Sequence, residues 1–275
     1  MSLKRAVNAI QKLYPLRYAD STWDNTGLLV DSSSSTIATS SSNTSILLTI
    51  DLTKAVVEEA INQKVQLIIA YHPFIFRGIK KIEPFANPQH DSLIKLISNG
   101  ISVYSPHTAI DAARGGVNDW LIEGVTSIDN VESKEIIEPN SEDPQNVGMG
   151  RYITLSNPIE LKDIVASVKH HLGLQHLQLA TNDINAPIKT VAICAGSGGG
   201  VFNQLKGKPV DLYLTGELSH HEVLSLKESG SSVIAAHHSN TERGYLKIVQ
   251  QQLQKELADT KIIVSTKDSD PYKTV

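Results

Sequence analysis

Short hydrophobic runs alternate with amphipathic stretches along most of this chain. Apolar runs bounded by turn residues predict strands, and apolar positions at helical spacing predict the helices between them. The first series has strands at 46–51, 65–70 and 101–104, and the helices between them lie at 53–63 and 89–98. A second series has a strand, a glycine turn with a short helix, a strand, a helix and a strand, within 190–236. Each series reads β-α-β-α-β, which predicts parallel strands covered by helices.

We therefore predict an α/β fold in which two pseudo-repeated β-α-β-α-β units pack around a shared metal-binding cleft, with a small inserted α+β segment. Residues 1–125 form the first α/β half, and residues 189–275 form the second half, which completes the same domain. Residues 126–188 are predicted to hold an acidic linker and the insert, whose helix begins near Pro158 and ends at two solvated histidines, His170 and His171.

Polar clusters follow the later strands of each series. In an open α/β sheet, the loops at the carboxyl ends of the strands form the ligand crevice, so clusters placed there can meet in space. The clusters are Tyr71-His72-Pro73, His107-Thr108 with Asp111, Thr215-Gly216-Glu217 with His220 and His221, and His237-His238 with Glu242. Their repeated position at strand ends predicts a functional site.

The spacing of His238 and Glu242 suits a metal, because a loop that opens into a helix lets these residues converge on Zn²⁺, Fe²⁺ or Mn²⁺. A capped helix explains the same residues, with Ser239 or Asn240 as the cap and Glu242 at the positive end of the helix dipole. The residues alone leave both interpretations open.

Two other polar segments have a structural and a functional interpretation. The glycine run 196–200 could present backbone N–H groups to a phosphate, but it matches no nucleotide motif, and a sharp strand-to-helix turn also requires glycine. The turn at 23–28 could contact substrate through Asp24 and Asn25, or form an Asx turn. His220 and His221 are candidate proton shuttles or substrate contacts.

Composition narrows the possible functions. Of 275 residues, 25 are Lys or Arg and 29 are Asp or Glu, so there is no basic surplus to grip nucleic acid and stable binding of it is not expected. The single cysteine, Cys194, excludes an internal disulfide framework and agrees with a reducing compartment. No apolar run is long enough to span a membrane, and a cytoplasmic location is expected. The basic first 19 residues also allow a mitochondrial one, although Val7, Ile10 and Leu13 favour a helix of the fold.

The ordered set of motifs resembles one known family over nearly the whole chain. The motifs are Trp23-Asp24-Asn25-Thr26-Gly27-Leu28, Tyr71-His72-Pro73, His107-Thr108 with Asp111, Thr215-Gly216-Glu217, and His238 with Thr241-Glu242. Together they resemble eukaryotic members of the Ngg-interacting factor three-like family, also labelled GTP cyclohydrolase I type two.

The resemblance implies a dinuclear site for one or two divalent metal ions, and a homo-oligomer, since relatives form rings or dimers. Carried over by position, the metal ligands are His72, Asp111, His238 and Glu242. Family members commonly have two adjacent histidines where this chain has Tyr71-His72. Neutral tyrosine is a poorer ligand than imidazole, which weakens the second metal position.

Two functions follow as hypotheses. The first is a metal-dependent hydrolase that acts on a nucleotide or related small molecule. Its catalytic residues would be Glu242, His107, His220 and His221, and its substrate contacts Asp24, Asn25, Tyr71 and Glu217. The alternative is a non-catalytic, metal-stabilised scaffold that binds a regulatory protein partner, a transcriptional adaptor according to the family's name.

Overall fold

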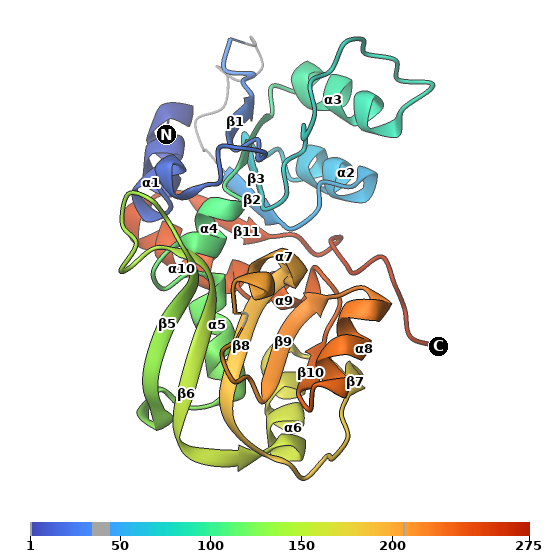
Figure 1. The fold of residues 1–275 in the computed structure, drawn as a ribbon. Helices are drawn as coiled ribbons and strands as arrows, with labels where there is room; N and C mark the ends of the chain where they lie inside the picture. The colour runs from blue at the N-terminus through green and yellow to red at the C-terminus, as the bar shows by residue number, and fades with distance from the viewer. Residues whose placement is uncertain (1, 35–44, 206) are drawn as a thin grey trace. The chain divides into compact units, whose positions relative to one another are not determined.

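The chain divides into two compact units, each built around one sheet (Figure 1). The computed structural model describes residues 2–34, 45–205 and 207–275. The first unit covers Met1–Ile110 and Leu246–Ser269, and the second covers Asp111–Tyr245 and Asp270–Val275. This division differs from the predicted boundaries, because the chain after Tyr245 returns to the first unit. Its strand, Lys261–Val264, pairs with Ser45–Thr49 in the first sheet.

The first unit contains a five-stranded sheet with the order β1-β4-β3-β2-β11. Its parallel strands are β2 (Ser45–Thr49), β3 (Leu67–Ala70), β4 (Ser102–Ser105) and β11 (Lys261–Val264), and β1 (Gly27–Val30) runs antiparallel to β4. The helices of this unit are α1 (Leu3–Leu13), η1 (Leu16–Tyr18), α2 (Lys54–Asn62), α3 (Pro88–Ser98) and α10 (Leu246–Glu256). The first predicted β-α-β-α-β series is confirmed as β2-α2-β3-α3-β4.

Local sequence signals explain where these elements begin and how they pack. The Thr53 hydroxyl accepts from the Val56 N–H at the start of α2, and the Asn87 side chain caps α3, which opens with Pro88. Every residue of β2 and β3 is buried, as expected for parallel strands covered on both faces. The helices supply the cover, with Val56, Val57, Ala60, Leu93 and Leu96 in the same apolar cluster as the strands.

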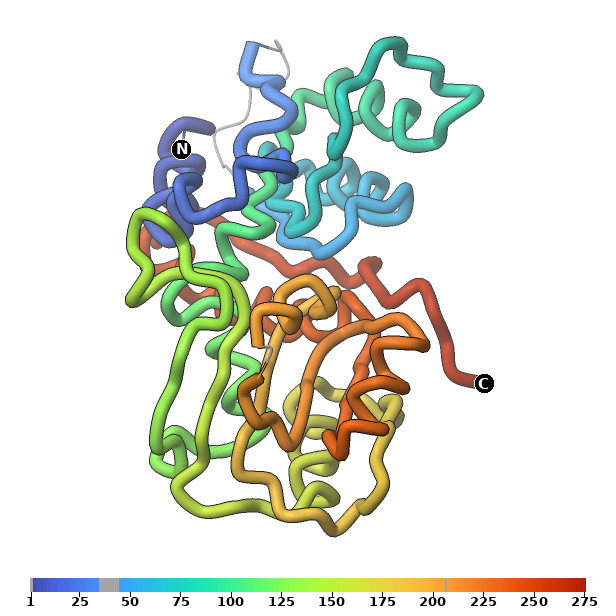
Figure 2. Tube along the Cα trace, in the orientation of Figure 1, coloured from blue at the N-terminus to red at the C-terminus, as the bar shows by residue number. Residues whose placement is uncertain are grey.

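The second unit contains a six-stranded sheet with the order β5-β6-β8-β9-β10-β7. Its strands are β5 (Val131–Pro139), β6 (Gly148–Glu160), β7 (Gln178–Ala180), β8 (Pro187–Ser197), β9 (Leu212–Glu217) and β10 (Ser232–Ala235). Its helical segments are α4 (Thr108–Ala112, which starts in the first unit), α5 (Val117–Val125), η2 (Ile128–Asn130), α6 (Leu161–Leu172), α7 (Gly199–Phe202), η3 (Asn203–Leu205), α8 (His220–Glu228) and α9 (Asn240–Arg243). The second predicted series is confirmed, since β8, β9 and β10 are parallel and joined through α7 and α8. Figure 2 follows the backbone through both units.

The segment between the repeats differs from the sequence expectation at three points. The acidic stretch forms the edge strand β5, because its backbone pairs with β6 while its charged side chains remain in solvent. The helix of the insert begins at Leu161, since Pro158 lies within β6. His171 is not solvated: its ring packs against Trp120 with centroids 4.2 Å apart, and burial lowers the pKa of its imidazole.

A buried arginine joins the insert to the second unit's helices. Arg151 on β6 is 1% exposed, and its guanidinium donates to both carboxylate oxygens of Asp119 and to three backbone carbonyls. Burial raises the pKa of Asp119, but the hydrogen bonds and charges of Arg151 and, less strongly, Lys134 outweigh this and hold that pKa below its ordinary value.

Within the described residues, no helix has both the length and the apolar character needed to cross a membrane.

Candidate functional site

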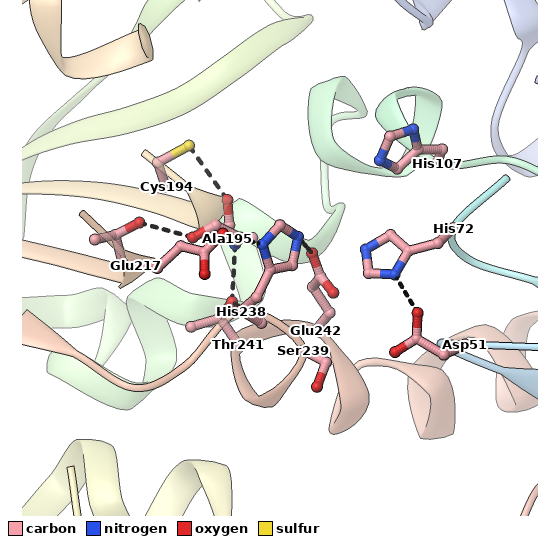
Figure 3. A network of polar contacts seen from close by, with 12 residues as sticks. Asp51, His72, His107, Cys194, Ala195, Glu217, His238, Ser239, Thr241 and Glu242 are labelled. Atoms are coloured by element: carbon pink, nitrogen blue, oxygen red, sulfur yellow. Dashed lines mark hydrogen bonds and ion pairs between the residues drawn. The ribbon is translucent and has the colours of Figure 1, made fainter. Parts of the chain in front are cut away.

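The carboxyl ends of the first unit's parallel strands bring three polar side chains to one edge of the sheet. Asp51 follows β2, His72 follows β3 and His107 follows β4. The His72 Nδ1 atom lies 2.9 Å from Asp51 Oδ1 (Figure 3). A carboxylate on one ring nitrogen fixes the tautomer and orientation of a histidine, as is common for metal-binding histidines.

His107 is held in the same way by Asp24. The His107 Nδ1 atom lies 2.7 Å from Asp24 Oδ1, and the Thr108 hydroxyl donates to the other oxygen. Burial raises the pKa of Asp24, but the hydrogen bonds and charge of His107 and the bonds from Thr108 outweigh it, so this carboxyl is held below its ordinary pKa. His107 has a φ of 37°, an uncommon backbone conformation that often marks functional sites.

The two held imidazoles lie side by side. The ring centroids of His72 and His107 are 5.5 Å apart, and Tyr71 packs edge-on against both, at 5.5 and 6.2 Å. Tyr71 is 1% exposed, so this side chain forms a wall of the histidine pair. The pair suits either metal coordination or proton transfer, since both imidazoles are oriented by a carboxylate.

The second unit carries the other predicted histidine and its carboxylates. The His238 Nδ1 atom lies 2.8 Å from Glu217 Oε1, and its Nε2 atom lies 3.4 Å from Glu242 Oε1 (Figure 3). Ser239 occupies the N-cap position of α9 without capping it, and its hydroxyl accepts from Arg243. A simple capped helix therefore does not explain these residues.

A glycine allows this cluster to form. Gly196 at the end of β8 has a φ of 63°, and a Cβ atom there would lie 2.8 Å from His238 Nε2 and 3.0 Å from Glu242 Oε1. The Gly196 N–H donates to the Thr241 hydroxyl, which in turn donates to the His238 carbonyl. Gly196, the first residue of the glycine run, thus allows close packing against the His238 and Glu242 side chains.

Two carboxylates of the second unit are buried near Cys194. Glu242 is 3% exposed and Asp111 on α4 is 8% exposed. Burial raises the pKa of the Cys194 thiol, and the negative charges of Asp111 and Glu242 add to this effect. Buried carboxylates are costly without compensating charge or donors, and a divalent cation is one group that compensates them. His72, His238 and Glu242 also offer donor atoms of the types that divalent metals take.

The other predicted site residues have varied positions. His220 and His221 are exposed at the start of α8, with ring centroids 5.3 Å apart. Asn25 donates to the Ile75 carbonyl, and His237 packs its ring against Tyr272. Sequence reasoning missed Asp51 and the contacts that Thr241 and Gly196 make. Only Asp51 had a readable signal, because it follows a predicted strand at the sheet edge where His72 also lies.

The fold and the oriented histidines define an α/β protein with a candidate metal centre. The chain belongs to the Duf34/NIF3 (NGG1p interacting factor 3) family, which matches residues 1–271. This confirms the family resemblance drawn from the motifs.

Relatives match over almost the full chain. The Saccharomyces cerevisiae protein named NGG1-interacting factor 3 is 48% identical, with 98% of this chain and 96% of that protein covered. Human NIF3-like protein 1 is 32% identical, with 100% and 93% covered. A Bacillus cereus protein related to NIF3 has the same fold, with a TM-score of 0.84 at 20% identity, covering 99% of this chain and 98% of that one.

Proposed function

We propose that this protein binds one or two divalent metal ions and hydrolyses a nucleotide or related small molecule. The metal ligands would be His72 of the first unit and Asp111, His238 and Glu242 of the second. The observation that carries the proposal is His238, whose Nδ1 is held by Glu217 while its Nε2 faces the buried Glu242 carboxylate. That arrangement orients an imidazole as a carboxylate–histidine–metal triad requires.

The donor set suits Zn²⁺, Fe²⁺ or Mn²⁺, because it mixes imidazole nitrogen with carboxylate oxygen. A bound divalent ion supplies a Lewis acid and lowers the pKa of a coordinated water. In the first unit, Asp51 keeps His72 in one ring orientation, as Glu217 does for His238 in the second. Each unit therefore contains one histidine of the predicted ligand set whose Nδ1 atom is held by a carboxylate.

His107 would move a proton during hydrolysis. Asp24 accepts from His107 Nδ1 and fixes the ring, so the other ring nitrogen is oriented to give or take a proton. The position of His107 beside His72 also makes it a candidate ligand. His220 and His221, exposed on α8, would meet the substrate or carry protons from solvent.

Metal content by elemental analysis, followed by turnover of a panel of nucleotides, tests the proposal. We expect the purified protein to hold a divalent metal, and His238→Ala to lose both metal and turnover. A folded protein that neither retains nor takes up metal would overturn the metal sites. Metal retained together with turnover that does not depend on His238 would overturn the catalytic assignment.

A second candidate function is a metal-stabilised scaffold for a regulatory protein. The name of the Saccharomyces cerevisiae relative, NGG1-interacting factor 3, supports a protein partner for this chain as well. Binding of purified NGG1 protein to this chain, measured by isothermal titration calorimetry, tests this candidate. Binding with no turnover of any nucleotide would favour the scaffold, whereas turnover without binding would favour the hydrolase.

A further inference from the structure

The segment between β3 and α3 exposes several large apolar side chains within a short stretch. Phe76, Ile79, Ile82 and Phe85 are each at least 38% exposed, and Phe85 is fully exposed. Isolated exposed apolar residues are common, but a cluster of them marks an interaction surface. We name residues 76–85 the apolar–basic loop. In Figure 1 the chain between β3 and α3 extends beyond the strands of the first unit.

Contacts at both ends hold the apolar–basic loop in place. At its start, the Asn25 side chain donates to the Ile75 carbonyl and the Gln89 side chain donates to the Phe74 carbonyl. Near its end, the Glu83 N–H donates to His90 Nδ1 at 3.0 Å. A surface that is ordered before binding loses less conformational entropy when a partner docks.

The loop begins beside an aromatic side chain that widens the apolar surface. Trp23 is 52% exposed, and its ring centroid lies 6.0 Å from that of Phe76. The Trp23 Nε1–H donates to Asp20 at 2.8 Å, which fixes the indole. Exposed tryptophan and phenylalanine held in one orientation are typical anchors of protein interfaces.

The charge of the loop indicates the chemistry of its partner. Arg77, Lys80 and Lys81 are exposed among the apolar residues, and Glu83 is the single acid between residues 76 and 85. This basic stretch belongs to a chain whose formal net charge is −4. Charge complementarity across an interface favours an acidic partner and accelerates its association.

We propose that the apolar–basic loop is a docking surface for an acidic protein segment in which apolar side chains alternate with aspartate or glutamate. A second copy of this chain would bring the same cations against one another in a two-fold interface, which is unfavourable. An anionic membrane is less suited, because polybasic membrane-binding segments carry about four to eight cations. The proposal goes beyond the metal chemistry and does not depend on it.

Fluorescence anisotropy with two synthetic peptides tests the docking surface. The first probe alternates aspartate and glutamate with leucine and phenylalanine, and the second has lysine in place of each acid. We expect the full chain to bind the acidic peptide at least about tenfold more tightly than the basic one. Equal affinity for the two peptides, or binding of neither, would overturn the proposal.

Variants of the loop separate its apolar and charged contributions. Lys80→Glu/Lys81→Glu should weaken binding of the acidic peptide about tenfold or more, and Ile79→Ser/Ile82→Ser should do the same. The matched controls are Lys4→Glu/Lys255→Glu and Ile128→Ser, which change exposed residues elsewhere and should bind as the unchanged chain does. Circular dichroism and metal content should be the same in all these proteins. Loop variants that bind like the controls would place the peptide elsewhere and overturn the proposal.

Two further measurements test whether an anionic membrane or a second copy of this chain occupies the loop instead. Sedimentation with phosphatidylserine–phosphatidylcholine vesicles should leave the protein in solution, and light scattering should give the same mass for the unchanged chain and Ile79→Ser/Ile82→Ser. Vesicle binding lost in the loop variants would assign the loop to a membrane and overturn the proposal. A change from oligomer to monomer in Ile79→Ser/Ile82→Ser would assign it to a second copy, with the same consequence.

Discussion

The His238 Nε2 atom lies 3.4 Å from the Oε1 atom of Glu242, four residues further along the chain. Glu242 lies on α9 and His238 lies just before that helix, so both side chains pack against Gly196 near the end of β8. Glu217, at the end of β9, contacts the other nitrogen of the imidazole. This relationship places an imidazole nitrogen and a carboxylate oxygen together, and both are donor types that divalent metals take.

Removing the carboxylate behind His238 should weaken metal binding without removing a ligand. We expect Glu217→Gln to lower metal affinity about 10- to 100-fold, because the ring loses the carboxylate that orients it and raises its basicity. Calorimetric titration of metal-free protein with Zn²⁺ or Mn²⁺ measures the change. His176→Ala, which alters an exposed histidine, is the control and should bind metal normally. An unchanged affinity in Glu217→Gln would contradict the proposed role of Glu217.

A methyl group at Gly196 should displace the same pair. In Gly196→Ala the Cβ atom would lie 2.8 Å from His238 Nε2, closer than such contacts normally come, and 3.0 Å from Glu242 Oε1, at a φ of 63°. We expect a loss of metal affinity and a stability loss of about 1 kcal/mol or more. Gly230→Ala is the matched control, since Gly230 has a φ of 92° but open space around its Cβ position. That variant should lose stability alone, as measured by urea denaturation, and keep its metal affinity.

Breaking the buried pair of Arg151 and Asp119 should destabilise the second unit. Asp119→Asn leaves the Arg151 cation buried without its counter-charge, which costs about 3–5 kcal/mol. Urea denaturation near neutral pH measures this loss. Asp129→Asn, at an exposed site in the same unit, should have little effect. A stability equal to that of Asp129→Asn would show that Asp119 is not needed to compensate Arg151.

The same pair predicts a pH dependence of stability. The pKa of Asp119 is lower in the folded protein than in the unfolded chain, where it is about 3.9. Its stabilising contribution is therefore fully present above that unfolded value and is lost as pH falls through the folded one. Denaturation curves at a series of acidic pH values should show a steeper loss for the unchanged chain than for Asp119→Asn. Identical slopes would contradict the lowered pKa.

The contact between Asp24 and His107 predicts a selective loss of turnover. Asp24 has a side chain that is fully buried, so we expect it to act through His107 and not by touching substrate. Asp24→Asn should reduce turnover of a nucleotide substrate about tenfold or more, since the imidazole loses its orienting carboxylate. Thr108→Val, which removes one donor to Asp24 but keeps the His107 contact, should have a smaller effect. The pH profile of turnover should change in Asp24→Asn alone.

The alternation of strands and helices in both repeats could be predicted from the sequence because the strands are apolar runs and because α2 and α3 have a periodic apolar face. Since parallel strands end at one edge of their sheet, the polar residues after β3 and β4, and those after β9 and β10, could also be placed at those edges as candidate site residues. The edge strand β5 could not, because its side chains remain in solvent and its stability comes from backbone pairing with β6.

What the sequence determined by itself was therefore the α/β class, the family and the residue types of the candidate site. The tertiary structure decided which carboxylate holds which histidine, as Asp51 does for His72 and Glu217 does for His238. It also decided that Gly196 must be small and that Arg151 must be buried. Hydrophobic periodicity records which face of an element is covered, whereas a contact between residues far apart in the chain depends on how whole elements pack.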